Sequence, residues 1–335
     1  MRFGYSERCL AHDTGDRHPE NPDRLRAIRR GLAKRHGVEY TEADPASRAA
    51  VTAVHDEGYV DEFESFCADG GGNWDPDTVA GEETWDAALM SAGLAQWAAE
   101  AALAGENGRR TPFSVGRPPG HHAVPDDAMG FCFFNNAAVA AQTVLDDGLA
   151  ERVAIFDWDV HHGNGTQDVF YERDDVFYAS IHEDGLYPAT GAISETGTGD
   201  GENATLNAPL AAGAGDADFL HVIDEALAPA LDRFGPDLLI VSAGFDAHRH
   251  DPISRMRVSS EGYALMTDHV RSIGADLDAA VAYVLEGGYG LDTLAEGVSM
   301  VHETYDGRTP IDPDDDPDAK TETIVSDLRS RLGLS

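Results

Sequence analysis

Residues 157–165 read Asp-Trp-Asp-Val-His-His-Gly-Asn-Gly and contain the residue types of a metal site. In an extended chain Asp157, Asp159 and His161 lie two residues apart and face the same way. A carboxylate and an imidazole at this spacing suit zinc or ferrous iron. Asp246 follows a separate apolar run and would supply a third ligand. Two carboxylates and one histidine leave a coordination position open, which is typical of a catalytic zinc site.

Two further clusters carry groups for proton transfer. In residues 117–123, Arg-Pro-Pro-Gly-His-His-Ala, a turn fixed by proline and glycine would direct His121 and His122 into one pocket. A neutral histidine beside a metal-bound water is the expected general base. In residues 285–290, consecutive glycines would let the Tyr289 hydroxyl donate to a developing oxyanion. Each cluster alone fits a surface turn, so the prediction depends on the clusters meeting in space.

Two aromatic residues flank these clusters. Phe131 follows Gly130, and Tyr187 precedes a proline. Both aromatics could form the walls of a narrow apolar channel for an extended aliphatic chain, or pack as ordinary core residues. The sequence leaves this choice open.

Five apolar runs rich in β-branched residues each precede a polar cluster, as buried strands of a parallel sheet do. They span residues 113–116, 153–158, 176–181, 238–243 and 281–285. Helical patterns include residues 83–103, 136–145 and 216–234. Strands alternating with helices predict a doubly wound α/β sheet. Ligands of such sheets bind beyond the carboxyl ends of the strands, so the polar clusters should converge on one rim.

The bulk composition bounds the class of protein. With 335 residues and 42% hydrophobic content we expect one large domain, comprising residues 1–307. Residues 308–335 should form an acidic linker and a short helix that docks on this domain. No apolar run suggests a membrane span or secretory signal, so we expect a cytoplasmic protein without membrane contact. The three cysteines, Cys9, Cys67 and Cys132, are odd in number and far apart, and should be reduced.

The formal net charge is -37, and only Lys34 and Lys320 among the 24 basic residues are lysines. Such a surface repels phosphates, so we expect no direct binding of nucleic acid. The acidic surface either attracts cationic substrates or keeps the protein solvated in a halophilic, high-salt cytoplasm. We favour the second interpretation because the acidic residues are spread along the whole chain.

From His18-Pro19-Glu20-Asn21-Pro22-Asp23-Arg24 to about Gly297, the motifs and their order resemble the histone deacetylase family, which includes the acetylpolyamine amidohydrolases. The resemblance implies the arginase-deacetylase fold, a single α/β domain with a mostly parallel eight-stranded sheet and helices on both faces. It implies a zinc-dependent amidohydrolase, with iron as an alternative metal. The expected substrate is acetyl-lysine in proteins, or alternatively an acetylated polyamine.

The resemblance also implies roles for individual residues. The zinc ligands would be Asp159, His161 and Asp246, and the catalytic residues would be His121, His122 as base, Asp157 orienting His121, Asn164 and Tyr289. The substrate channel would contain Gly130, Phe131 and Tyr187, and Arg24 would line an inner cavity. A structural potassium ion would bind at Asp157, Asp159, His161, Ser180 and Ile181.

Asn164 stands where some relatives have an aspartate. A neutral amide raises an imidazole pKa less than a carboxylate does, so we expect His122 to remain a neutral base near pH 7. A two-manganese ureohydrolase is a rival prediction, since the fold is shared. A non-catalytic acetyl-lysine binding module is a second rival, although it should have lost ligands or base. The sequence leaves the oligomeric state open, including a homodimer or a larger assembly.

Overall fold

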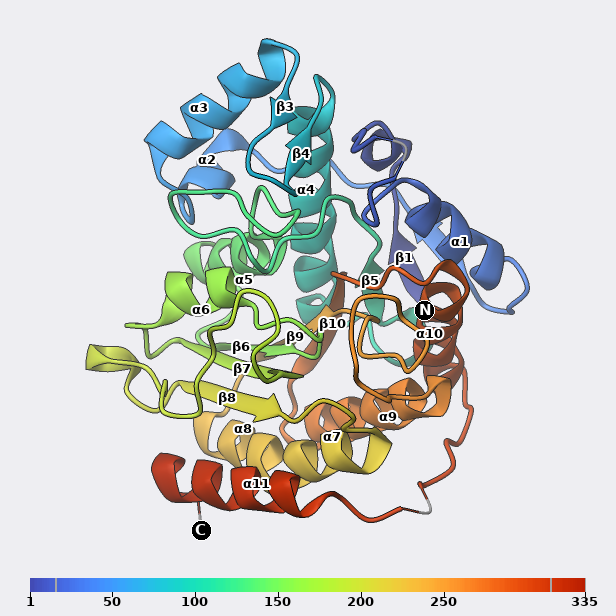
Figure 1. The fold of residues 1–335 in the computed structure, drawn as a ribbon, viewed down its shortest axis with the longest axis vertical. Coiled ribbons are helices and arrows are strands. Elements are labelled where there is room, and N and C mark those ends of the chain that lie inside the picture. The colour runs from blue at the N-terminus through green and yellow to red at the C-terminus, as the bar shows by residue number, and fades with distance from the viewer. Residues whose placement is uncertain (16, 314, 335) are drawn as a thin grey trace.

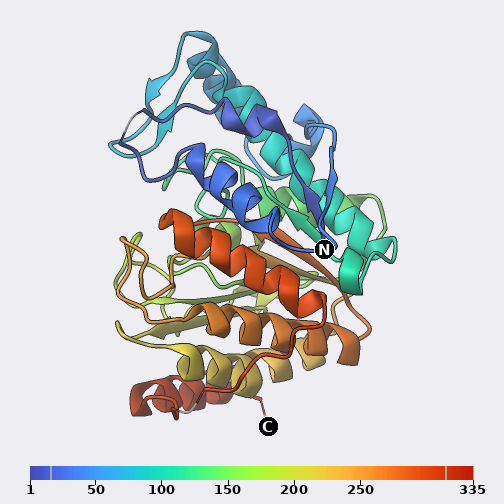
Figure 2. The ribbon, with the colours of Figure 1, turned by 90° about the vertical axis from the view of Figure 1, so that its right-hand side faces the viewer.

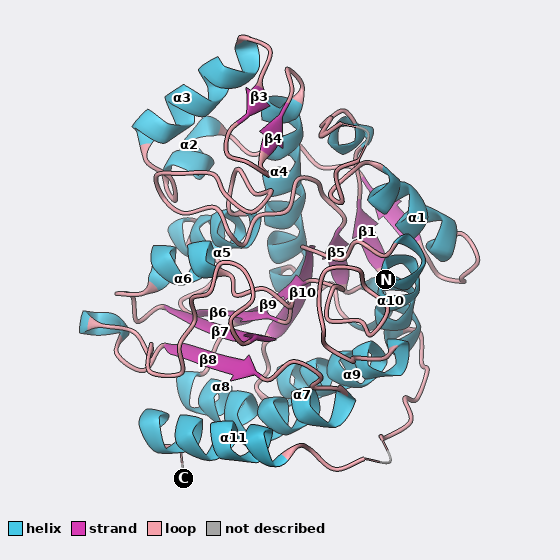
Figure 3. Cartoon of the chain, in the orientation of Figure 1, coloured by secondary structure: helices cyan, strands magenta, loops and turns pink. Residues whose placement is uncertain are grey.

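An eight-stranded parallel sheet runs through the computed structural model, which describes residues 1–15, 17–313 and 315–334 (Figures 1 and 3). The strand order is β2-β1-β5-β10-β9-β6-β7-β8, and each neighbouring pair is parallel. The strands are β1 (Arg2–Gly4), β2 (Glu39–Thr41), β5 (Pro112–Ser114), β6 (Val153–Asp157), β7 (Val176–Glu183), β8 (Thr205–Leu210), β9 (Leu238–Ala243) and β10 (Ala280–Leu285). A separate antiparallel pair is formed by β3 (Gly72–Asn73) and β4 (Val79–Ala80).

Helices cover both faces of the sheet, as Figures 1 and 2 show. One face packs against α2 (Arg48–Thr52), α3 (Glu57–Ala68), α4 (Thr84–Leu103), α5 (Asn136–Asp146) and α6 (Asn164–Phe170). The other packs against α1 (Asp23–Leu32), α7 (Asp216–Val222), α8 (Ala228–Phe234), α9 (Ser260–Asp276), α10 (Leu291–Tyr305) and α11 (Ala319–Leu332). Short 3-10 turns occupy η1 (Glu7–Leu10), η2 (Gly108–Arg110) and η3 (Gly199–Gly201). The predicted doubly wound α/β fold is confirmed.

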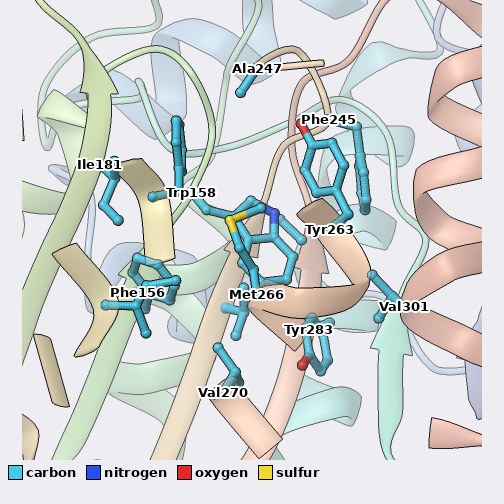
Figure 4. Close-up of a cluster of buried hydrophobic side chains, with 14 of the residues drawn as sticks. Phe156, Trp158, Ile181, Phe245, Ala247, Tyr263, Met266, Val270, Tyr283 and Val301 are labelled. Atoms are coloured by element: carbon cyan, nitrogen blue, oxygen red, sulfur yellow. The ribbon is translucent and has the colours of Figure 1, made fainter. Parts of the chain in front are cut away.

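Strand β6 shows how the sheet separates core from site. Ala154 and Phe156 belong to the apolar cluster on one face, and Val153 and Ile155 to the cluster on the other. The alternation continues past the strand, where Trp158 and Val160 stay in the first cluster. Figure 4 shows the buried Trp158 ring among Phe156, Tyr263 and Met266. Burial of these large side chains anchors the turn that carries the candidate metal ligands.

All five predicted strands are present in the eight-stranded sheet, but its other three strands and the β3–β4 pair were missed. β1 and β2 have three residues each, too few to show a period, and β8 mixes polar with apolar residues. The predicted helix over 216–234 is interrupted by a π-helical turn, Ile223–Leu227, between α7 and α8. Pro229 lacks the N–H that would bond to the Glu225 carbonyl, and the Ala228 N–H bonds instead to the Ile223 carbonyl. Arg329 of α11 donates to the Glu225 carbonyl at 3.0 Å.

Helix α11 closes the sheet at the β8 side, near the bottom of Figure 1. Val325, Leu328 and Leu332 are buried in the core cluster. Asp218 of α7 accepts hydrogen bonds from the Asp318 N–H at 2.8 Å and the Thr321 hydroxyl at 2.7 Å. The helix is therefore held by an apolar stripe and by a bonded N-terminus. Among the described residues, no helix combines the length and apolar character that crossing a membrane requires.

Candidate active site

Asp159, His161 and Asp246 come together beyond the carboxyl ends of β6 and β9, where the sequence predicted them. One ligand atom from each lies within 4.8 Å of the others. His161 Nδ1 is 3.0 Å from Asp159 Oδ1 and 3.2 Å from Asp246 Oδ2. Both carboxylates are fully buried. This donor set of two oxygens and one nitrogen suits a divalent metal such as zinc.

The electrostatics of this group also fit a cation. Asp246 Oδ2 is buried and accepts no hydrogen bond, and the contact given for this anionic oxygen is the 3.2 Å approach of His161 Nδ1. Burial opposes protonation of His161, yet the carboxylates of Asp159 and Asp246 raise its pKa to about 10. The three side chains therefore create a field that favours positive charge, which a bound divalent cation would supply.

Two glycines allow the carboxylates to approach this closely. A Cβ at Gly244 would lie 2.1 Å from Asp159 Oδ2, and one at Gly287 would lie 2.2 Å from Asp246 Oδ2. The Gly287 N–H donates to Asp159 Oδ2 at 2.8 Å. Any side chain at either position would displace a candidate ligand.

His121 and His122 lie side by side, with ring centroids 4.0 Å apart. His121 Nδ1 is 3.0 Å from Asp157 Oδ2, and His122 Nδ1 is 2.9 Å from Asn164 Oδ1. Burial acts against the charge of His121, but Asp159 and Asp157 raise its pKa to about 10. Burial and the neighbouring His121 hold the pKa of His122 well below its ordinary value. These opposite shifts favour a proton on His121 over one on His122, and the amide carbonyl of Asn164 orients a neutral His122 with its Nε2 unprotonated.

The loop after β10 places Tyr289 beside this group. Burial raises the pKa of the Tyr289 phenol well above its ordinary range, so the hydroxyl remains a donor. Arg24 lies under the loop, fully buried, with its guanidinium 5.0 Å from the Tyr289 ring. Arg24 donates to the Gly288 carbonyl at 2.8 Å and also to the Glu286 carbonyl. The residue predicted to line an inner cavity therefore holds the glycine loop.

Sequence reasoning missed three buried carboxylates around the site. Glu286 accepts from the backbone N–H groups of Gly120 at 2.7 Å and His121 at 3.2 Å. Glu20 binds Arg117 through both oxygens, and Asp251 accepts from the Tyr289 loop. The sequence does show that these acidic residues stand next to apolar strands or within polar clusters. It does not show which loop each carboxylate contacts.

Tyr187 lies against the histidine pair, and Phe131 lies beside Tyr289. The Tyr187 ring stands edge-on to His122, with centroids 5.1 Å apart, and the Phe131 ring is 5.8 Å from that of Tyr289. Gly130 packs against both His122 and Tyr187, since a Cβ there would lie 2.4 Å from His122 Cδ2 and 2.9 Å from Tyr187 Cε1. Phe131 also lines a surface hollow of about 530 Å³ together with Thr14, His18, Pro19, Pro76 and Asp77.

The residues expected around potassium lie at neighbouring strand ends. Asp157 of β6 is paired in register with Ser180 of β7, and Ile181 follows. The Ser180 hydroxyl is 2.9 Å from His182 Nδ1. This places Ser180 next to the Asp157–His161 turn, on the β7 side.

Comparison with known proteins identifies the family. A profile of the Histone deacetylase domain matches residues 18–305. The chain is 39% identical over 312 residues to a Histone deacetylase-like amidohydrolase of Pseudomonas aeruginosa, covering 86% of this chain and 81% of that protein. It is 42% identical over 227 residues to Acetylpolyamine amidohydrolase 1 of the same organism, covering 67% and 63%. The crystal structure of the HDA15 HD domain superposes with a TM-score of 0.90 at 35% identity, covering 99% of this chain and 94% of that one. The chain therefore belongs to the histone deacetylase family of amide hydrolases.

Proposed function

We propose that this protein is a zinc-dependent deacetylase that hydrolyses the N-acetyl amide of acetyl-lysine in proteins. The proposal is carried by one juxtaposition: a buried three-ligand group lies against a histidine pair whose two pKa values are shifted in opposite directions. Opposite shifts in neighbouring groups are how an enzyme provides an acid and a base at one pH.

The roles of the residues follow from this geometry. Zinc held by Asp159, His161 and Asp246 would supply the Lewis acid that polarises the acetyl carbonyl and makes a water more acidic. His122 accepts the proton of the attacking water at Nε2, because its Nδ1 is engaged by Asn164. The Tyr289 hydroxyl donates to the oxyanion that develops on the carbonyl oxygen. A protonated histidine then gives a proton to the leaving nitrogen as the C–N bond breaks, which releases acetate and the free amine.

A second candidate substrate class is acetylated polyamines. The 42% identical relative named Acetylpolyamine amidohydrolase 1 supports it. Burial raises the pKa of the Tyr187 phenol, and the nearby carboxylates of Asp77 and Asp75 raise it further. An acidic mouth would attract the cationic amines of a polyamine.

We further propose that residues 1–307 form the catalytic domain, that residues 308–335 serve as linker and docking helix, and that the protein works in a salt-rich cytoplasm. Structural potassium at the Asp157–His161 turn, with Ser180 and Ile181, belongs to the same proposal. The register of β6 with β7 supports this site, because it brings the two strand ends together.

The test is a substrate panel with each metal assayed separately. Metal-depleted protein is loaded with zinc or with ferrous iron and given an acetyl-lysine peptide, acetylputrescine and acetylspermidine. Faster hydrolysis of the peptide by the zinc form supports the proposal, and preference for the small amines selects the alternative. Tyr289→Phe should bind zinc normally and lose about 10² to 10³ in turnover, the usual cost of one oxyanion donor. Turnover close to wild type would remove Tyr289 from the mechanism.

A further inference from the structure

Asp251 contacts the tyrosine-bearing loop through backbone groups other than those that Arg24 binds. One carboxylate oxygen, Oδ2, accepts from the backbone N–H groups of Tyr289 at 2.7 Å and Gly290 at 2.9 Å. The other, Oδ1, accepts from the Ile253 N–H at 3.1 Å. The residue is 7% exposed. Both oxygens are therefore bonded to backbone amides, and the two bonds to the loop have the short lengths typical of charge-assisted bonds.

The segment that carries Asp251 also carries a candidate metal ligand. Asp246 lies five residues earlier, and the N–H of Phe245 donates to the Gly287 carbonyl at 3.0 Å. The Asp251 N–H bonds back to the His248 carbonyl at 2.7 Å, which closes the turn. One short segment thus touches the 286–290 loop at two places, and Asp251 forms the second.

We propose that Asp251 is a positioning residue, which fixes the Tyr289 hydroxyl relative to the metal by binding the backbone amides of Tyr289 and Gly290. This inference rests on the proposed function, because it assumes that Tyr289 is the oxyanion donor. Arg24 binds carbonyl groups of the loop, and Asp251 binds its N–H groups.

The physical reason is the conformational freedom of the loop. Gly288 has φ +115, a conformation that glycine adopts easily, so the preceding residues alone do not fix the direction of Tyr289. A misplacement of about 1 Å in a catalytic group can cost about 100-fold in rate. A carboxylate on two successive amides removes that freedom without touching the substrate.

The experiment combines Asp251→Asn with Tyr289→Phe in a double-mutant cycle. Asp251→Asn keeps the size of the side chain but loses the charge and one acceptor oxygen. We expect kcat to fall about 10- to 100-fold, with KM and zinc content unchanged. In the Tyr289→Phe background the same change should alter kcat by less than about threefold, since the hydroxyl that Asp251 positions is already gone. Asp251→Ala should show a larger loss in the same pattern.

A second readout does not depend on activity. Amide hydrogen exchange of residues 286–290 should be faster in Asp251→Asn than in wild type. Asp216→Asn is the matched control, because Asp216 also accepts from a backbone N–H and a hydroxyl, those of Ser259, but lies away from the loop. The control should leave both kcat and the exchange of this loop unchanged.

Three results would overturn the inference. The first is unchanged amide exchange of residues 286–290 in Asp251→Asn. The others are a double variant whose loss of kcat equals the product of the two single losses, or an Asp251→Asn variant that loses only zinc binding. Failure of the proposed function would look different. The wild-type protein would then hydrolyse no acetylated amine, whereas amide exchange of residues 286–290 would still be faster in Asp251→Asn.

Discussion

The rim of the sheet and the outer surface are both rich in carboxylates, but they hold them in opposite ways. At the rim, Glu20, Asp157, Asp159, Asp246 and Glu286 are 0% exposed. Four of the five form hydrogen bonds through both carboxylate oxygens, whereas Asp246 accepts one from the Val160 N–H at Oδ1 and none at Oδ2. On the surface, the Glu7 and Asp61 side chains are 82% and 67% exposed, and their arginine partners are partly exposed as well.

This difference distinguishes the buried carboxylates of the candidate site from the exposed carboxylates that keep the protein solvated. Burying a carboxylate is costly unless it is paired, so a buried group without a full set of partners indicates a site for a ligand. Exposed ion pairs in water contribute little individually. The formal charge of -37 therefore describes mainly the surface, whereas a handful of buried carboxylates lines the candidate site.

The largest effect should follow removal of a candidate metal ligand. Asp246→Asn should reduce zinc content well below one ion per chain and lower activity by more than about 100-fold. Replacing a residue that only hydrogen-bonds to a metal ligand already lowers metal affinity or activity by about 10- to 100-fold. Metal analysis of the dialysed protein and acetyl release together measure this. A variant with full zinc content and full activity would show that the rim carboxylates are structural.

Breaking the buried ion pair below the site should cost the most stability. Glu20 accepts from Arg117 Nε at 2.5 Å and Nη2 at 2.7 Å, and both residues are 0% exposed. Glu20→Gln would leave the Arg117 charge uncompensated and should lower the free energy of unfolding by about 3–5 kcal/mol. Chemical denaturation measures the change.

The pH dependence of that loss has a definite sign. Burial alone would raise the pKa of Glu20, but Arg117 and His12 hold it well below its ordinary value. A depressed pKa contributes stability that is complete above the unfolded value of about 4.3. The advantage of wild type over Glu20→Gln should therefore be constant near neutrality and shrink as the pH falls below about 4. An advantage that grew in acid would contradict the assignment.

The stability that helix α11 contributes should depend on its apolar packing and not on its charged side chains. Leu328 is 0% exposed. Leu328→Ala should cost about 2–5 kcal/mol of stability through lost burial and the cavity left behind. Because α11 lies on β8 and α7, kcat of the folded variant should match wild type. A comparable loss of kcat would show that residues 308–335 take part in catalysis.

The smallest effect is expected on the acidic surface. Asp327 pairs with Arg331 at 3.0 Å, with side chains 43% and 40% exposed. Asp327→Asn should change stability by no more than about 1 kcal/mol, and the difference should disappear in molar salt. A parallel salt titration of wild type tests the halophilic interpretation, which predicts weaker stability at low salt.

The sequence predicted most of the site because strand ends are readable. Asp159 directly follows the apolar run 153–158, and Asp246 comes three residues after the run 238–243. Parallel strands bring such ends together. Short or polar strands gave no such signal, which is why β1, β2 and β8 were missed. The partners of Asp251 and Glu286 depend on how loops fold over the rim, and spacing along one segment contains no information about contacts with another.

The carbonyl of Glu225 links two parts of the chain that are far apart in the sequence, because proline leaves it without its usual helical donor. Pro229 cannot bond to it, and Arg329 of the last helix does so at 3.0 Å. Dissolved ions weaken the attraction of Arg329 to the Glu225 carboxylate, but they affect a contact with an uncharged oxygen much less. Attachment of the C-terminal segment is thus partly independent of the ionic medium, a useful property for a chain with so many acidic residues.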